Sequence, residues 1–180
     1  MKKNSSLGKI IASLSYEEKI KYIASHSSPI EVLDNISEGL EIDGKLAIKL
    51  STKIEIASNE KSSSYILEKM SLDCDIGVKT SVAMNLVTSP KVLKNLSACK
   101  NSVVREGVAI NQNTPLSILK TLMKDENFLI REKVLKHRST TMEMLEELSN
   151  DNDRNIKLAA NRKLTILQIK DTQQGNIKWV

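Results

Sequence analysis

Five cations recur in this sequence at a constant spacing of 26 residues, and they are the first candidates for chemistry. They are Lys53, Lys79, Arg105, Arg131 and Lys157. A row of cations on one face could hold the phosphates of a nucleic acid. A structural role is the competing interpretation, because Asp73, Asp125 and Asp151 each precede one of them by six residues and could cap or pair across a turn. We favour the structural role.

Cys99 interrupts the aspartate series, because it stands where the neighbouring units carry Asp. A cation that lacks its carboxylate partner is left with fewer hydrogen bonds. The sequence therefore predicts that Arg105, six residues after Cys99, is less satisfied and more accessible than the other cations.

Histidine and cysteine offer little for catalysis or metal binding. His26 and His137 occupy positions where other units carry Asn, so we interpret both as turn residues. Cys74 and Cys99 have no nearby His, and the sequence contains no Gly-rich phosphate loop and no nucleophile motif. We predict that the chain is not an enzyme and that it uses no metal and no cofactor.

The composition restricts the class of protein further. A chain of 180 residues fits one domain, and 27 Lys plus Arg against 22 Asp plus Glu give a net charge of only +5. Five aromatic residues are too few for an aromatic-lined pocket or a base-stacking platform. Two cysteines, no apparent signal peptide and no apolar run of membrane length predict a cytoplasmic protein that does not enter a membrane.

Apolar residues follow the same 26-residue step, which is typical of a tandem repeat. The pattern Ala-x-Asn occurs at 57–59, 83–85 and 109–111, and again at 159–161 after a step of 24. Apolar spacings of three and four within each unit predict two short helices. We expect first helices near 28–37, 62–72, 88–98, 114–124 and 140–149, and second helices near 47–58, 77–86, 103–111, 129–138 and 154–168, after a leading helix near 16–26.

Polar columns mark the turns between these helices. Ser62, Thr88, Thr114 and Thr140 recur at the start of the first helices, where a side-chain oxygen can accept from free first-turn N–H groups. Thr140 and Glu143 have the spacing of a capping box. The recurring Asn59, Asn85 and Asn111 are predicted to close the backbone of the inter-helix turn.

The unit at 104–125, VREGVAINQNTPLSILKTLMKD, resembles the leucine-rich repeat variant family, whose pattern is V-R-x-x-V-A-x-N, then T-P, then L-L-x-x-L and an Asp. The resemblance covers 52–161, weakens over 17–51 and ends near 165. It implies an all-α, right-handed, HEAT-like solenoid of about five repeats of short paired helices. Some members of the family carry an iron–sulfur cluster, but two cysteines cannot supply one.

The domain plan follows from the extent of the repeats. We predict an N-terminal extension at 1–15, a single helical-repeat domain at 16–168 with an insertion near 38–50, and a C-terminal tail at 169–180. Trp179 in that tail suits either an anchor or a side chain that caps the last helix.

The faces of a solenoid that stacking leaves free are the candidates for binding. Met84 and Ile110 are apolar at second-helix positions opposite the predicted core, so they could form an exposed strip. Its predicted rim is charged and consists of Glu106, Glu132, Lys133 and Lys136. An apolar centre with a charged rim is typical of a protein-binding patch. Contact of Met84 and Ile110 with the next repeat is the alternative.

These observations favour a non-enzymatic protein-binding scaffold. By analogy, a chain of this size and build also suits a small bacterial immunity or inhibitor protein that covers a toxin. The alternative is a HEAT-like module that binds nucleic acid through Lys79, Arg105, Arg131 and Lys157 on a concave face.

Overall fold

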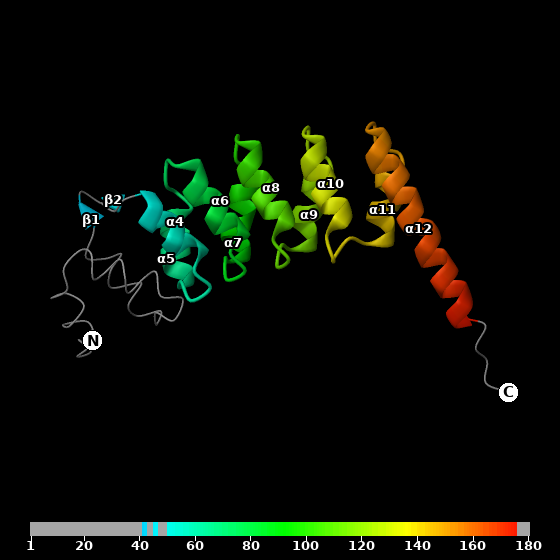
Figure 1. Cartoon of the computed structure of the whole chain (residues 1–180), viewed down its shortest axis with the longest axis horizontal. Helices are drawn as coiled ribbons and strands as arrows, with labels where there is room; N and C mark the ends of the chain where they lie inside the picture. The colour runs from blue at the N-terminus through cyan, green and yellow to red at the C-terminus, as the bar shows by residue number, and fades with distance from the viewer. Residues whose placement is uncertain (1–40, 43–44, 47–49, 176–180) are drawn as a thin grey trace. The chain divides into compact units, whose positions relative to one another are not determined.

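The computed structural model describes residues 41–42, 45–46 and 50–175, in two compact units that divide after Asn111. We describe each unit by itself. Regular structure in the described residues is helical, as predicted, apart from one small hairpin (Figure 1). Its strands, β1 (Glu41–Ile42) and β2 (Lys45–Leu46), lie within the predicted insertion. The helices predicted near 16–26 and 28–37, like His26 and Trp179, lie outside the described residues.

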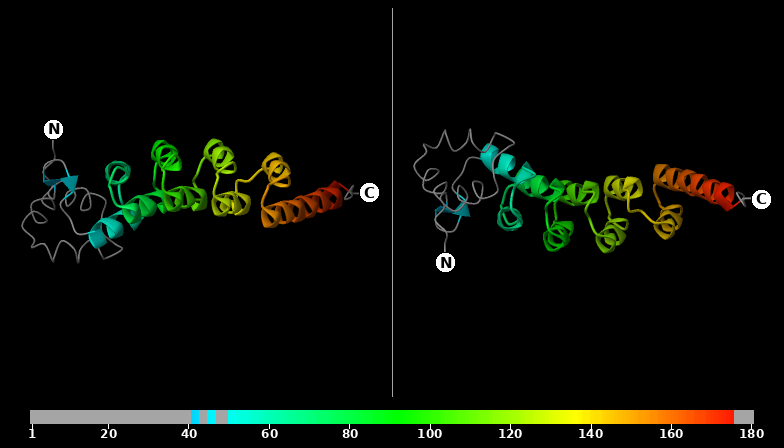
Figure 2. Two further views of the ribbon diagram at one scale, coloured as in Figure 1. Left: turned by 90° about the horizontal axis from the view of Figure 1, so that it is seen from above. Right: turned by 90° about the horizontal axis from the view of Figure 1, so that it is seen from below.

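The first unit contains five helices among its described residues. They are α4 (Leu50–Ser58), α5 (Ser64–Met70), α6 (Ile76–Met84), α7 (Pro90–Ser97) and α8 (Ser102–Ile110). Helix α6 packs against both α4 and α8. Helices α5 and α7 lie together on one side of this row (Figure 2). Short helices in this unit therefore alternate between two layers.

The second unit repeats the alternation with four described helices. They are α9 (Leu116–Leu122), α10 (Phe128–Lys136), α11 (Met142–Leu148) and α12 (Arg154–Gly175). Helices α9 and α11 lie on one side of α10 and α12 (Figure 2), and α12 packs against both α10 and α11. Predicted helix ends agree to within three residues, except that α12 continues past the predicted end at 168 to Gly175.

The buried side chains follow the 26-residue columns. In the second helices, Val78, Val104, Ile130 and Ile156 are almost inaccessible to solvent, and so are Val82, Val108, Val134 and Ala160 four residues later. The first helices bury a matching set, which includes Leu67, Leu93, Leu119 and Leu145. Each fully buried aliphatic side chain of this size stabilises the fold by roughly 1.5–3 kcal/mol. The repeated columns therefore form the core of each unit.

The predicted N-caps of the first helices are wrong by one residue. The side-chain oxygens of Ser63, Ser89 and Thr141 accept hydrogen bonds from backbone amides of the first turn. Each of these residues lies one position after the predicted column. The capping box at Thr140 is therefore absent, because Thr141 accepts from the Met144 amide instead.

The predicted cap residues have a different role, which is to tie the turn to the preceding helix. The hydroxyl of Ser62 donates to the Ile56 carbonyl at 2.5 Å, and the Thr88 hydroxyl donates to the Val82 carbonyl at 2.6 Å. Thr140 donates in the same way to Val134. Because each of these carbonyls lies six residues upstream near a helix end, the hydroxyl satisfies an acceptor that the helix leaves open.

Asparagine closes the turns as predicted, and it also links successive repeats. The side-chain oxygen of Asn85 accepts from the Val87 amide at 2.9 Å within its own turn. Its amide nitrogen donates to the carbonyls of Ala57 and Asn59, at 2.8 and 2.9 Å, in the preceding repeat. Asn111 donates likewise to Ala83 and Asn85. These inter-repeat bonds keep the 26-residue register of the first unit.

The same column continues in the second unit with different residues. Nδ1 of His137 accepts from the Ser139 amide at 3.1 Å, which makes His137 a turn residue as predicted. Lys163 donates from Nζ to the Leu135 carbonyl at 2.9 Å, 28 residues upstream, the separation that joins Asn85 to Ala57. Lys163 therefore occupies the last position of the turn column, 26 residues after His137. The Ala-x-Asn pattern at 159–161, which has a step of 24, is not the structural counterpart of the earlier copies.

Candidate functional site

The basic column joins adjacent repeats through the aspartate column. Lys53 Nζ lies 2.6 Å from Asp73 Oδ2, and Arg131 forms two hydrogen bonds of 2.8 and 2.9 Å to the carboxylate of Asp151. Each aspartate also accepts from the backbone amide two residues later. Lys53 and Arg131 therefore do pair with members of the aspartate column, but with other members than the sequence predicted. In both, the cation precedes its carboxylate by 20 residues, whereas the predicted spacing has Asp six residues before the cation.

The ion pairs shift the titration of both aspartates. Burial alone would raise the pKa of Asp73, but hydrogen bonds from Lys53 and the Asp75 amide outweigh it and lower the pKa below its ordinary value. The hydrogen bond from Arg131 lowers the pKa of Asp151, with burial acting in the opposite direction. The same bond raises the pKa of Arg131. Both carboxylates therefore stay ionised in the folded protein at neutral pH.

Arg105 contradicts the prediction that it is accessible. Its side chain is buried, with only 8% of the residue exposed, and it donates to the carbonyls of Cys99 and Lys100 at 2.9 and 3.0 Å. Arg131 makes the equivalent bonds to the carbonyls of Asp125 and Glu126. Six residues before each arginine, the group that accepts from the guanidinium is thus a backbone carbonyl and not a carboxylate. This hydrogen bond is therefore kept where Cys99 replaces Asp.

With a spacing of 20 residues between cation and carboxylate, Cys99 stands where the aspartate partner of Lys79 would be. Lys79 is half-buried, and its ammonium group forms no ion pair with the residues that the structure describes. Lys157 is exposed and likewise has no ion pair in that part of the chain. Of the four candidate nucleic-acid contacts, Lys79 and Lys157 are thus the more open, while Arg105 and Arg131 are bonded within the turns.

The predicted apolar strip lies at the C-terminal ends of α6 and α8. Met84 is 49% exposed and Ile110 is 37% exposed. The adjacent turn adds Leu86 and Val87, at 48% and 44% exposed. Neither was predicted as part of the strip, and helix α6 ends at Met84, two residues before the predicted end at 86. Bonds from Asn111 to the carbonyls of Ala83 and Asn85 bring these two helix ends together. We call Met84, Leu86, Val87 and Ile110 the α6–α8 patch.

Part of Met84 also serves the alternative role of contact with the next repeat. A Cβ placed on Gly107 would lie 3.1 Å from the Ala83 Cβ and 3.4 Å from the Met84 Cγ. The stem of Met84 therefore lies against α8, because Gly107 leaves room for it, while about half of the residue stays exposed.

The predicted rim is divided between the two units. Glu106, on α8, is half-buried in the unit that carries the α6–α8 patch. Glu132, Lys133 and Lys136 are on α10 in the other unit, where Lys136 Nζ lies 2.6 Å from Glu132 Oε1. The structure therefore brings Met84, Ile110 and Glu106 together on two packed helices and places the other three on a separate unit.

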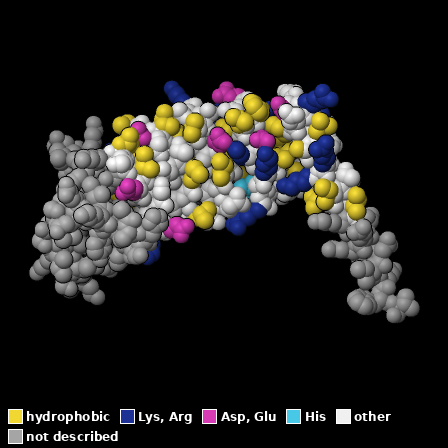
Figure 3. All heavy atoms as spheres, viewed as in Figure 1, with side chains coloured by type: hydrophobic (Ala, Val, Ile, Leu, Met, Phe, Trp, Pro, Cys, Tyr) yellow, Lys and Arg dark blue, Asp and Glu magenta, His cyan; other side chains and the backbone are white. Residues whose placement is uncertain are grey.

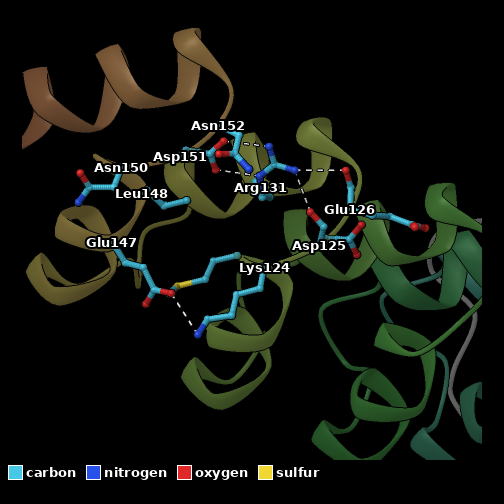
Figure 4. A pocket seen from close by; sticks show the side chains of 10 residues that line it. Lys124, Asp125, Glu126, Arg131, Glu147, Leu148, Asn150, Asp151 and Asn152 are labelled. Atoms are coloured by element: carbon cyan, nitrogen blue, oxygen red, sulfur yellow. Dashed lines mark hydrogen bonds and ion pairs between the residues drawn. The ribbon is translucent and has the colours of Figure 1, made fainter.

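A polar groove of about 530 Å³ is present in the second unit, where the turns after α9 and α11 meet (Figure 4). Lys124 and Glu147 form a 3.1 Å ion pair at its edge. Arg131 bonds to the Asp151 carboxylate on one side and to the backbone of the 125–126 turn on the other. Because these groups bond to one another, the groove joins two repeats and is a weaker candidate for binding than the α6–α8 patch.

Conventional catalytic groups do not gather in the part of the chain that the structure describes. Cys74 and Cys99 are both free thiols, and no group of three or more His, Cys, Asp or Glu side chains suits a metal ion there. His137 is only 2% exposed. Within the same residues, no helix combines the length and the apolar character needed to cross a membrane.

Comparisons of the chain with protein-family models, with curated proteins and with solved structures found no match.

Proposed function

We propose that the chain is a HEAT-like solenoid of repeats of about 26 residues, similar to leucine-rich repeat variant proteins, and that it is a non-enzymatic protein-binding scaffold. The proposal is supported by the alternating helices of each unit and by the inter-repeat bonds of Asn85 and Asn111. Proteins built in this way bind partners with the surfaces that stacking leaves exposed.

The α6–α8 patch is the observation that carries the proposal. Four apolar residues are each more than a third exposed at neighbouring helix ends, although their helices have a well-packed core. Apolar groups that gather at one place on a soluble protein mark interaction sites more often than single scattered ones do. We therefore propose that a partner protein covers Met84, Leu86, Val87 and Ile110.

The test is a double substitution, Met84→Asp with Ile110→Asp, on the full chain. Partner capture from the source cells should be lost while the circular dichroism spectrum and the melting temperature stay close to those of the wild type. Leu72→Asp is the matched control, because Leu72 is 80% exposed and lies outside the patch. Unchanged capture by the double variant would contradict the proposed site, and loss of folding would show that the two side chains are needed for the packing of α6 against α8.

A narrower proposal, made by analogy, is a small cytoplasmic immunity or inhibitor protein that neutralises a bacterial toxin. Its test is co-expression with the product of the neighbouring gene. The wild-type chain should restore growth and the Met84→Asp, Ile110→Asp variant should not. If the neighbouring product is harmless, the toxin assignment is wrong while the scaffold proposal is unaffected.

Nucleic-acid binding is the second candidate, and the open ammonium groups of Lys79 and Lys157 favour it. It is weakened because Arg105 and Arg131 are bonded to backbone carbonyls. Lys79→Ala with Lys157→Ala should preserve stability, since neither ammonium group bonds to described residues. If that variant loses a salt-dependent affinity for RNA or DNA that the wild type shows, the column binds phosphate.

A further inference from the structure

Helix α12 exposes apolar side chains on a face that the described residues of its unit leave uncovered. Ile166, Ile169 and Leu158 are 54%, 49% and 46% exposed. Together with Arg162 they are spaced by four, four and three residues, so they lie along one side of the helix. The opposite side buries Ile156 and Ala160. We call Leu158, Arg162, Ile166 and Ile169 the α12 stripe.

The repeat register identifies this side as a stacking face. In the first unit, Gly107 of α8 packs beside the Thr80 carbonyl and the Met84 side chain of α6. Leu158 and Arg162 lie three repeat steps of 26 residues after Thr80 and Met84, so they occupy the equivalent positions of α12. The α12 stripe therefore begins at the positions that α8 partly covers in α6, and among the described residues no following helix covers them in α12.

Charge indicates what kind of helix would fit. Among its described side chains, residues 154–169, α12 has four cations and no carboxylate. Lys163 donates to the Leu135 carbonyl, but Arg154, Lys157 and Arg162 are exposed and form no ion pair with described residues. Lys and Arg side chains also gather over the second unit on the face seen in Figure 3. The stripe is thus apolar with positively charged side chains within it and beside it.

We propose that the α12 stripe binds an amphipathic helix of a partner protein, with acidic residues beside its apolar face. Leucine or isoleucine of such a helix would cover Leu158, Ile166 and Ile169, and its carboxylates would pair with Arg162 and Arg154. A second copy of α12 would place its own arginines against Arg154 and Arg162, and like charges repel. Charge complementarity therefore favours an acidic partner. The proposal uses no residue of the α6–α8 patch and stands separately from it.

The test is a titration of the full-length protein against two dye-labelled synthetic helical peptides, followed by fluorescence anisotropy. Both peptides carry leucines with the spacing of the stripe. One has glutamate at the flanking positions, and its twin has lysine there. The acidic peptide should bind at least about tenfold more tightly than its twin. Ile166→Ser with Ile169→Ser should weaken it by about tenfold or more, and Arg162→Glu should reverse the preference between the two peptides.

Two controls separate binding from folding. Leu116→Ser, at a 39% exposed position of α9, should leave binding unchanged, and all variants should melt close to the wild type. Met84→Asp with Ile110→Asp should also leave peptide binding intact, so failure of this proposal is distinguishable from failure of the α6–α8 patch.

Several results would overturn the proposal. These are an absence of saturable binding, equal affinity for the two peptides, or full binding by the Ile166→Ser, Ile169→Ser variant. Stripe-dependent binding to phosphatidylserine vesicles without peptide binding would assign the surface to a membrane instead. A concentration-dependent dimer in sedimentation velocity that Ile166→Ser abolishes would assign it to a second copy of the chain.

Discussion

The two units have the same repeat register and differ in the residues that occupy its polar positions. The first unit has Asn85 and Asn111 in the turn column, where the second has His137 and Lys163. The helix-end position of Met84 and Ile110 is Lys136 and Arg162 in the second unit, and Gly107 is replaced by Lys133. Buried columns cannot change freely because neighbouring helices pack on them, whereas the outer columns can.

This difference gives the units different surfaces and different polar links. Amide-to-carbonyl bonds join the repeats of the first unit, which exposes an apolar patch. The ion pairs of the second unit include Arg131 with Asp151, Lys120 with Glu143 and Lys124 with Glu147, and those of the first unit include Lys53 with Asp73 and Lys91 with Glu68. The comparison teaches that one repeat scaffold can carry two unlike candidate binding surfaces.

Loss of the inter-repeat amide should have the largest effect. Asn111→Ala removes two buried hydrogen bonds and leaves the carbonyls of Ala83 and Asn85 without that donor. We expect a loss of about 2–4 kcal/mol in the free energy of unfolding, measured by urea denaturation. Asn95→Ala, at an exposed position of α7, should cost less than about 0.5 kcal/mol. Equal effects would show that the amide ladder is not important for stability.

A side chain at Gly107 should come next. Gly107→Val places atoms against Ala83, whose Cβ would lie 3.1 Å from the new Cβ, so α6 and α8 must move apart at a cost of about 1–3 kcal/mol. At the equivalent position of the second unit, Lys133→Val should cost less than about 1 kcal/mol. Thermal unfolding of the two variants checks the difference. A stable Gly107→Val protein would refute the close approach of α6 and α8.

The buried ion pair of the second unit should have an intermediate effect. Asp151→Asn removes the charged partner of Arg131, whose side chain is only 14% exposed, and should cost about 1–2 kcal/mol at neutral pH. The Lys53 and Asp73 pair in the first unit offers the parallel variant Asp73→Asn. A similar loss of unfolding free energy for both variants would show that the ion pair between repeats contributes equally to the two units, although the residues of the turn column differ between them.

The same pair predicts an acid dependence. Because the folded-state pKa of Asp151 lies below its ordinary value of 3.8, its stabilisation is complete above that pH and is lost as the pH falls through the folded-state pKa. The stability difference between wild type and Asp151→Asn should therefore be constant near neutral pH and shrink below pH 3.8. Urea titrations across this range measure it, and a difference that grows on acidification would contradict the ion pair.

The exposed ion pair should have the smallest effect. Lys124 and Glu147 are 67% and 51% exposed in their side chains, so Lys124→Ala should change stability by no more than about 0.5 kcal/mol. Raising the salt concentration should reduce even that difference. A loss as large as that of Asp151→Asn would mean that the groove between α9 and α11 depends on this pair.

Periodicity in the sequence was sufficient to predict the helices and most of the core, because apolar spacing reflects which side of a helix is buried. It misplaced the hydroxyl column, since Ser62 and Ser63 are both competent caps and only the turn geometry selects Ser63. It also missed Leu86 and Val87, because the helix predicted at 77–86 ends at Met84 and both side chains lie in the turn that follows. The candidate site was thus predicted in part, from Met84 and Ile110.

The sequence by itself determined the 26-residue unit, the helical class of the repeat region and the small number of aromatic residues, because these are properties of residue order and composition. The partners of the polar columns were decided only by tertiary structure. Arg105 is buried against a carbonyl, Lys163 substitutes for asparagine, and the cations pair with aspartates 20 residues later. Such pairings depend on which turn faces which helix end in three dimensions, and linear spacing does not specify that.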